Sequence, residues 1–461
     1  MLVAVCLGQF MIQLDLTIVN VALPSIGVDL SAPVSTLQWV VDGYNVALAS
    51  LMLLGGRLGD RSGHKRVYLA GLALFAVGSG LCALAPASGW LIGARVLQGM
   101  GAAIELPATL AILSHTFVAG RERAQAVGLW TGAAGSSLVI GPVLGGALIA
   151  WFGWRAVFIV NLPVAVVIGL LVLGTVSEAV EPDSGGLDLA GQVLGTAALA
   201  LSAAGVIEGG RQGFTAPLPV ILLLAGGLSL IAFLGIERRR ATPLLPLSFF
   251  HRPAYAAANA DGLVMGFVTI GLLFLFGLFF QQVEGDSALL AGLRFLPLTV
   301  AFVLAGPLVG RVIERVGPRI PIAAGCALMG LGSLLLLRAG AGSGYLSVAW
   351  PFAIIGIGYG LTSTPMAAAV LAAVPPQRAG MASSTNLTAR LAGGVLGIAI
   401  LGALLPGAGV AHARGPGFAL AFTSGLHAAL GITAAVALAG AAAAALFIRT
   451  VRNAGTSGTS A

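Results

Sequence analysis

Four ionisable side chains lie within stretches of sequence that are otherwise apolar: Asp15, Arg95, Glu105 and Asp261. Each stretch is long enough to cross a membrane as a helix, and a charge inside such a helix costs about 2.5 to 3.5 kcal/mol on insertion scales. Residues kept at that cost are candidates for function. A carboxyl group in this setting can hold a proton or pair with a bound cation. Because the two compete, Asp15 is a candidate both for proton coupling and for binding a cationic small molecule.

Arg95, Gln98 and Glu105 share one face of a helix, because their spacing of i, i+3 and i+10 keeps them within about 80°. The helical rise separates Arg95 from Glu105 by about 15 Å, so the two do not pair directly. Arg95 therefore needs a partner from another segment, and Asp15 and Asp42 both qualify. We interpret Glu105 as a proton or substrate site and Gln98 as a substrate contact. A charge pair that only stabilises the helices is the alternative.

A second polar stripe is formed by Gln38, Asp42 and Asn45, spaced at i, i+4 and i+7. We expect this stripe to face the substrate path, with Asp42 and Asn45 as binding residues. An edge position in solvent is the alternative for Asp42. In the second part of the chain, Asp261 is the candidate for a cation contact and Tyr359 for an aromatic wall. Aromatic residues in membrane helices more often pack against lipid or neighbouring helices.

The composition requires a membrane protein. Of the 461 residues, 58% are hydrophobic and 8% charged, whereas soluble domains carry about 25% charged residues. The formal charge of +7 therefore indicates membrane topology rather than nucleic-acid binding. Lys65 is the only lysine and lacks the context of a phosphate-binding loop. Cys6, Cys82, Cys326 and the five histidines are scattered, so no metal site, cofactor or enzymatic activity is predicted.

A helix-length apolar window predicts fourteen spans. The first stretch lacks the basic segment of a secretory signal, so we expect it to be the first membrane helix. The predicted spans are 2–28, 38–58, 67–86, 90–113, 125–150, 155–176, 189–208, 217–236, 255–280, 289–312, 320–338, 345–373, 386–405 and 418–448.

Charge placement predicts the orientation. With the N-terminus in the cytoplasm, the loops on that side and the C-terminal tail collect 16 of the 23 basic residues. The positive-inside rule therefore predicts that both the N-terminus and the C-terminus lie in the cytoplasm. The abundance of alanine, glycine and arginine, with a single lysine, is typical of GC-rich bacterial genes. We expect a monomeric multi-pass protein of the bacterial cytoplasmic membrane, with the lipid bilayer as its environment.

One charged sequence of ten residues occurs twice with related residues, and we call it the repeated phrase. Residues 56–65 read GRLGDRSGHK after the second span, and residues 310–319 read GRVIERVGPR after the tenth. The alternative is that any short turn between membrane helices is rich in glycine and arginine. Equivalent places in the topology favour two related six-helix halves, the build of many secondary transporters. The predicted division is 1–176 for an N-terminal bundle, 177–252 for two inserted helices, 253–450 for a C-terminal bundle and 451–461 for a cytoplasmic tail.

These motifs resemble the major facilitator superfamily, and in particular its fourteen-helix drug:proton antiporter branch. The resemblance covers nearly the whole chain. It rests on a loop motif at Gly56, Asp60, Arg61, Gly63, Lys65 and Arg66, on Arg95, Gln98 and Gly99, and on a helix 5 motif at Gly135, Gly141, Pro142, Gly145 and Gly146. Further matching stretches are LDLTIVNVALP at 14–24, WVVDGYN at 39–45 and WRAVFIVNLP at 154–163.

The resemblance implies an all-α membrane fold of two six-helix bundles with two inserted helices. It implies proton-coupled export of amphipathic compounds, cationic ones in particular, with Arg95 contributing to proton coupling. The loop motif is expected to form ion pairs that close a cytoplasmic gate. The close-spaced glycines and Pro142 of the helix 5 motif suit a hinge, with plain helix packing as the alternative. A dedicated exporter of one metabolite or self-made antibiotic is the second hypothesis. A membrane enzyme or receptor fits the sequence less well.

Overall fold

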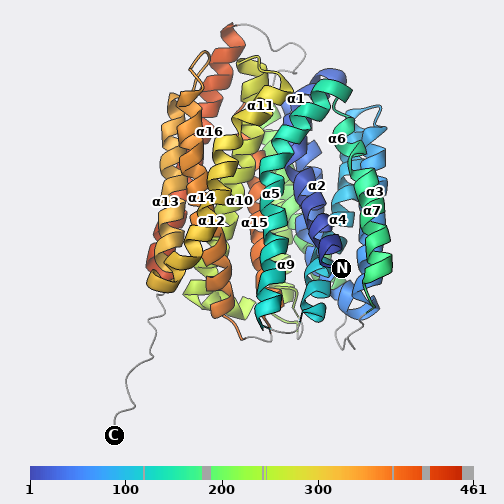
Figure 1. The fold of residues 1–461 in the computed structure, drawn as a ribbon. Helices are drawn as coiled ribbons and strands as arrows, with labels where there is room; N and C mark the ends of the chain where they lie inside the picture. Colours follow the sequence, from blue (N-terminus) through green and yellow to red (C-terminus); the bar gives the residue numbers. More distant parts are fainter. Residues whose placement is uncertain are drawn as a thin grey trace.

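The computed structural model is built of helices joined by short loops, with no strand among the residues that it describes, which are 1–117, 120–178, 188–240, 243–245, 247–375, 378–406 and 416–448 (Figure 1). Fourteen helices in this part are long and apolar enough to cross a membrane. The predicted all-α polytopic fold is thereby confirmed, although helix ends differ from the predicted ones by a few residues. The predicted tail at 451–461 lies outside the described residues.

The first half contains the spans that carry most of the candidate residues. Its helices are α1 (Leu2–Asp29), α2 (Val34–Ser62), α3 (His64–Ala83), α4 (Ser88–Thr116), α5 (Gly120–Phe152), α6 (Ala156–Ile159) and α7 (Asn161–Thr175). The sixth span is thus divided at Val160 into α6 and α7. Two inserted helices follow, α8 (Leu189–Gln212) and α9 (Pro217–Glu237).

The second half is interrupted more often than the apolar pattern predicts. Its elements are η1 (Leu247–His251), α10 (Pro253–Leu278), η2 (Phe279–Val283), α11 (Ala288–Arg294), α12 (Leu296–Val316), α13 (Arg319–Leu335), η3 (Leu336–Arg338), α14 (Leu346–Ala372), α15 (Ala379–Gly402) and α16 (Pro416–Phe447). The ninth span ends in a π-helical turn, η2, and the tenth is broken at Phe295.

The two halves pack their helices in the same pattern. In the first half α2 and α3 both pack against α4, and α1 packs against α5. In the second half α12 and α13 pack against α14, and α10 packs against α15. The repeated phrase ends α2 and α12 in the same way, because Gly63 and Gly317 have φ of +93° and +72°, which favours glycine. The halves are therefore structural repeats.

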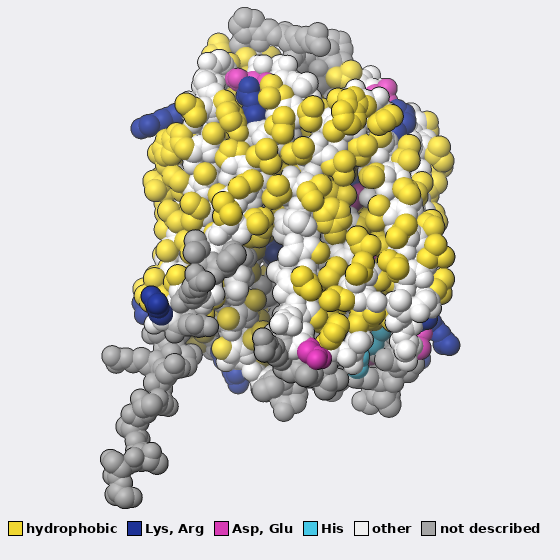
Figure 2. Space-filling model, in the orientation of Figure 1, with side chains coloured by type: hydrophobic (Ala, Val, Ile, Leu, Met, Phe, Trp, Pro, Cys, Tyr) yellow, Lys and Arg dark blue, Asp and Glu magenta, His cyan; other side chains and the backbone are white. Residues whose placement is uncertain are grey.

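The halves meet along two seams, α5 against α11 and α2 against α15, and α8 packs across the second seam. We call the end of the bundle with the α2–α3 loop the motif end, which is the lower end in Figure 1, and the opposite end the far end. The space-filling view in Figure 2 shows hydrophobic side chains over most of the flank, with charged ones mainly near the two ends. This distribution suits a protein surrounded by lipid.

The first seam is closed at the far end and separates toward the motif end. A Cβ atom added to Gly292 of α11 would overlap the Pro142 carbonyl of α5, so the two backbones touch there. A Cβ on Gly135 would lie 3.6 Å from Phe302 of α12. Further toward the motif end, the glycines on the same two helix faces have no described atom within 4 Å of an added Cβ: Gly128, Gly132, Gly306 and Gly310. The two helices therefore diverge along this seam.

Candidate functional site

Asp15 lies at the centre of a hydrogen-bond network inside the first half. Arg95 Nη1 donates a hydrogen bond to Asp15 Oδ2 at 2.5 Å, and Gln98 Nε2 donates one to Asp15 Oδ1 at 2.9 Å. Arg95 Nη1 also donates to Gln98 Oε1 at 2.7 Å. All three side chains are fully buried. The i, i+3 spacing in α4 presents Arg95 and Gln98 to one carboxylate of α1, as the sequence predicted for this helix face.

Two neutral residues complete the network, and neither is among the predicted site residues. Asn161 Nδ2 donates to Asp15 Oδ1 at 3.2 Å and to Ser79 Oγ at 3.0 Å. Ser79 also accepts from Gln98 Nε2 at 3.3 Å. Asn161 is the first residue of α7, so the break in the sixth span places its amide beside Asp15. The signal was present in the sequence as an Asn-x-Pro element inside an apolar span, but a search for ionisable residues passes over it.

Arg95 is fixed from several sides. Its Nε donates to the Val40 carbonyl at 3.1 Å, and its guanidinium carbon lies 4.2 Å from the ring centroid of Tyr44. Asp15 is therefore its acidic partner, which resolves the choice between Asp15 and Asp42 that the sequence left open. Arg95 Nη2 has no hydrogen-bond partner among the described residues. A planar guanidinium can make hydrogen bonds in several directions and stack on an aromatic ring at the same time, which an ammonium group cannot do.

Glu105 lies apart from this network, about two turns beyond Gln98 along α4. It is fully buried, and its Oε1 borders Gly8 of α1 together with the hydroxyl of Tyr68 from α3. An added Cβ on Gly8 would overlap both groups, so the absence of a side chain there makes room for them. Glu105 is thus a second acidic centre, enclosed by α1, α3 and α4 of the same half.

The polar stripe of α2 lies at the seam with α15. Gln38 Nε2 donates to the carbonyls of Ile398 and Ala399 at 2.8 and 3.1 Å, which joins the two halves. Asp42 and Asn45 are fully buried, and their side-chain atoms have no hydrogen-bond partner among the described residues. A buried polar side chain without a partner is costly, so both residues would gain from a bound polar molecule, as would Glu105, whose two carboxylate oxygens also lack a partner among the described residues.

The two candidates of the second half occupy different places. Asp261 of α10 is enclosed within its own bundle, where the Cys326 thiol lies 3.9 Å from Oδ1 and an added Cβ on Gly440 would lie 3.2 Å from the same oxygen. Tyr359 of α14 packs edge-on against Phe302 with ring centroids 4.7 Å apart. Since Phe302 faces Gly135 of α5, Tyr359 lies close to the first seam.

The loop motif contacts the end of α7. Lys65 donates its backbone N–H to Glu178 Oε1 at 3.1 Å and its Nζ to the Leu173 carbonyl at 3.1 Å. Arg66 Nε lies 3.6 Å from Glu178 Oε2, and Asp60 lies 3.6 Å from His64 Nε2. Arg57 Nη2 donates to the Pro243 carbonyl at 3.2 Å, beyond the inserted helices. The contacts of Lys65 and Arg66 thus tie the motif to α7 of its own half.

The helix 5 motif contacts both halves through its small residues. Added Cβ atoms on Gly141 and Gly145 would overlap Thr17 and Ile18 of α1, and one on Gly146 would overlap the backbone of α11. The Pro142 carbonyl meets Gly292, as described above. The motif therefore lets α5 pack closely against α1 on one side and α11 on the other.

The fold and the buried network define a class: a polytopic transporter of two helical repeats. The model of the Major Facilitator Superfamily matches residues 5–398, and the chain belongs to this family. The chain is 38% identical to the multidrug resistance protein Stp of Mycobacterium tuberculosis over 404 residues, which cover 88% of the chain and 75% of that protein.

Two further comparisons extend this result. The chain is 36% identical to the methylenomycin A resistance protein of Streptomyces coelicolor over 403 residues, covering 87% of the chain and 84% of that protein. Among solved structures, a bacterial homologue of the human lysosomal transporter Spinster, in an inward-facing and unoccupied conformation, superposes with a TM-score of 0.71 over 96% of the chain and 95% of that structure. At 18% identity this last similarity concerns the fold alone.

Proposed function

We propose that this protein exports amphipathic, preferably cationic, drug-like compounds across the bacterial cytoplasmic membrane in exchange for protons, by alternating access between its two halves. The observation that carries the proposal is the buried carboxylate of Asp15, held by Arg95, Gln98 and Asn161. The names of the relatives, a multidrug resistance protein and an antibiotic resistance protein, agree with it. The motif end is cytoplasmic in this proposal, with both termini on that side, and a monomer is the working unit.

The network supplies a way to couple a proton to a conformational change. Asp15 and Arg95 form a buried pair with no exposed surface, so their charges compensate each other. A proton bound to Asp15 leaves the Arg95 charge buried without its partner, which costs several kcal/mol unless the surroundings rearrange. The helices that hold Asp15 and its three donors, α1, α4 and α7, must therefore shift when Asp15 changes its protonation state. Proton binding and helix movement become one event.

The other candidate residues take supporting roles. Glu105 is proposed as a second proton site, because it is enclosed by the same helices on the motif side of the network. Asp42 and Asn45 are proposed to contact substrate at the α2–α15 seam, and Tyr359 at the α5–α12 seam. Gln98 accepts a hydrogen bond from Arg95 and donates to Asp15, and it is proposed to contribute to substrate binding through Asp15. Asp261 is proposed to stabilise a cationic substrate only when α10 shifts relative to α13.

The gate and hinge are proposed from the two motifs. Toward the motif end α5 and α12 diverge, so the structure is proposed to be open to the cytoplasm. In the opposite state the Gly56–Arg66 loop would close that end, with Asp60, Arg61 and Lys65 exchanging partners. The glycines of α5 would remain in contact with α1 and release α11, which makes α5 the moving element.

The test is proton movement in proteoliposomes. Purified protein is reconstituted into acid-loaded vesicles, and lipophilic cations and neutral drugs are added one by one. Wild-type protein should release protons on adding a substrate, and Asp15→Asn should lose this release because the exchangeable carboxyl is gone. Asp29→Asn is the matched control on the same helix, since Asp29 is half-exposed and pairs with Arg155 at the far end. Coupled export that survives in Asp15→Asn would refute the proposal.

A second candidate is a dedicated exporter of one antibiotic or metabolite. The similarity to the methylenomycin A resistance protein favours it. In the same vesicles, a dedicated exporter would respond to one compound of a panel of natural antibiotics and to none of the general lipophilic cations. Proton release on adding several unrelated cations would favour the multidrug assignment instead.

A further inference from the structure

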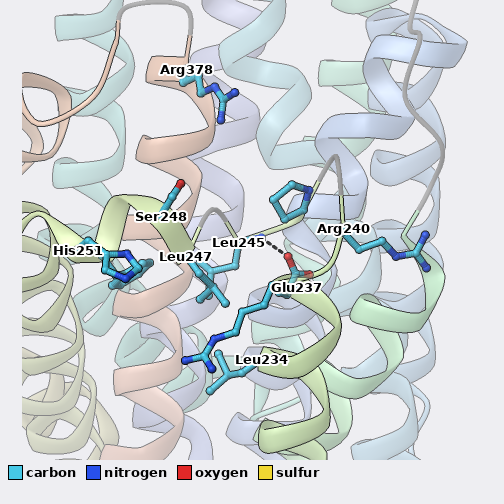
Figure 3. A pocket seen from close by; sticks show the side chains of 11 residues that line it. Leu234, Glu237, Arg240, Leu245, Leu247, Ser248, His251 and Arg378 are labelled. Carbon is cyan, nitrogen blue, oxygen red and sulfur yellow. Dashed lines mark hydrogen bonds between the residues drawn. The ribbon is translucent and has the colours of Figure 1, made fainter.

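A cavity of about 750 Å³ at the motif end is lined by more basic than acidic side chains. It lies between the end of α9, the segment η1 and the start of α15 (Figure 3). In Figure 3, Arg378 and His251 lie on the side of the second half, across the cavity from Glu237 and Arg240. Arg238 also lines it, so three guanidinium groups surround one cavity.

Glu237 is the one acidic side chain among the described residues that line this cavity, and only its Oε2 has a hydrogen-bond partner. Glu237 is 3% exposed, and its Oε2 accepts the Leu245 N–H at 3.1 Å, as Figure 3 shows. Arg240 pairs with Asp188 at 3.3 Å, which takes up part of its charge. Arg238 and Arg378 have exposed side chains directed to the cavity region. The cavity therefore has at least two arginines available to a bound anion.

A second, apolar cavity of about 290 Å³ lies on the other side of Leu245, which lines both. It is enclosed by α2, α8, α9 and α15, and its walls include Leu199, Leu230, Phe233 and Leu396. Polar side chains are a minority of the lining, namely Ser50, Gln192, Ser202 and Thr388. A basic cavity at the end of the bundle and an apolar cavity further along the helices thus meet at one residue.

We propose that these two cavities bind one anionic phospholipid. The headgroup phosphate would lie between Arg238 and Arg378, and an acyl chain would enter the apolar cavity past Leu245. A phosphate alone could bind the arginines, but only a lipid uses both cavities. Clusters of arginine at the cytoplasmic ends of membrane helices recognise anionic headgroups in this way. The leaflet that supplies the lipid depends on the proposed orientation, whereas the binding itself does not.

This lipid would bridge the parts of the protein. The apolar cavity is lined by α2 from the first half, by α15 from the second and by both inserted helices. A ligand there contacts both sides of the seam, so its affinity must differ between conformations in which α2 and α15 are differently placed. The inserted helices, which a two-bundle transporter does not need for its repeat, would thus form the wall of a lipid site at the seam.

The test is lipid binding by native mass spectrometry of the purified full-length protein. Phosphatidylglycerol should bind in preference to phosphatidylcholine with the same acyl chains. Arg238→Ala and Arg378→Ala should each weaken phosphatidylglycerol binding about fivefold, which corresponds to about 1 kcal/mol for one basic residue at an anionic surface. Arg239→Ala is the matched control, because Arg239 is the adjacent arginine and does not line the cavity. It should bind as wild type does.

Two further arms separate the possible sources of the anion. Glycerol 3-phosphate, which has the phosphate without acyl chains, should fail to displace phosphatidylglycerol at equal concentration. Ala198→Phe, which fills the apolar cavity, should weaken phosphatidylglycerol binding without removing the arginines. Equal binding of the two lipids, equal loss in Arg239→Ala, or displacement by glycerol 3-phosphate would each overturn the proposal. None of these readouts depends on transport. A failure of the lipid-binding proposal can therefore be distinguished from a failure of proton-coupled export.

Discussion

At the scale of single residues, Arg95 shows most clearly why residue type matters at this site. It donates to Asp15, Gln98 and Val40 from one planar group and stacks over Tyr44. In Arg95→Lys, one ammonium can keep the pair with Asp15 but cannot hold the other contacts. We expect transport to fall at least about tenfold, and stability to fall by roughly 1.5 to 3 kcal/mol as hydrogen bonds of a charged group are lost.

Transport in vesicles and thermal unfolding in detergent measure these two effects. Arg155→Lys is the control, because Arg155 pairs with Asp29 at a half-exposed position and exposed pairs contribute less than about 1 kcal/mol. It should leave both quantities nearly unchanged. If Arg95→Lys behaved like this control, Arg95 would act only as a positive charge, and the geometry described above would not matter.

The sequence predicted three members of the network, Asp15, Arg95 and Gln98, but not Ser79 and Asn161. Asp15 and Arg95 follow from the cost of charged groups in apolar spans, and Gln98 follows from its helical spacing to Arg95. Ser79 and Asn161 do not, since neutral polar residues are common in membrane helices and only tertiary packing tells which of them meet. The pairing of Arg95 with Asp15 rather than Asp42 likewise required the packing of α1 against α4.

At the scale of elements, α5 and α11 close the far end of the first seam through backbone contact. In Gly292→Val the new side chain would overlap the Pro142 carbonyl, and overpacking of this kind costs about 1 to 3 kcal/mol. The substitution should therefore shift the protein toward states in which the far end is open. The measurement is the alkylation rate of a cysteine placed at Leu289, which faces Gly146, in a variant without the native cysteines. We expect at least a fivefold increase.

The matched control for this experiment is Gly93→Val. Gly93 lies in α4, where an added Cβ meets no described atom within 4 Å, so the same change in residue type adds no overlap. In Gly93→Val, the cysteine placed at Leu289 should be alkylated at the same rate as in the unsubstituted background. A Gly292→Val protein that also matched the background would show that the α5–α11 contact has room to relax and does not close the far end.

The breaks within spans were the elements that the sequence did not predict. Apolar windows predicted fourteen spans, but they treated 155–176 and 289–312 as continuous helices. The structure divides them at Val160 and at Phe295 and adds a π-helical turn at Phe279–Val283. An apolar window measures transfer into lipid, and helix breaks change that quantity little. A proline follows each of the first two breaks, Pro163 after Val160 and Pro297 after Phe295, but an apolar window does not weigh this signal.

At the scale of the whole molecule, the repeat was visible in the sequence but the neighbours of each helix were not. The phrases at 56–65 and 310–319 predicted two halves, and both end a helix with a left-handed glycine. Spans that are apolar all round, such as α9, carry no stripe that identifies a partner helix. The position of α8 across the α2–α15 seam therefore came only from the structure, and so did the contact of Gln38 with the other half.

Gln38 allows the coupling between halves to be tested. Its amide is a side-chain link from α2 to the α15 backbone, and its loss should weaken the seam by about 0.5 to 1.5 kcal/mol. Gln38→Ala should thus raise the population of far-end-open molecules about two- to tenfold, read from distances between spin labels on the exposed ends of α2 and α15. Gln192→Ala is the control, because Gln192 donates to Ser50 and links α8 to α2 without joining the halves. An equal shift in both variants would mean that the seam responds to any lost buried amide, and that the two halves are not held together at Gln38.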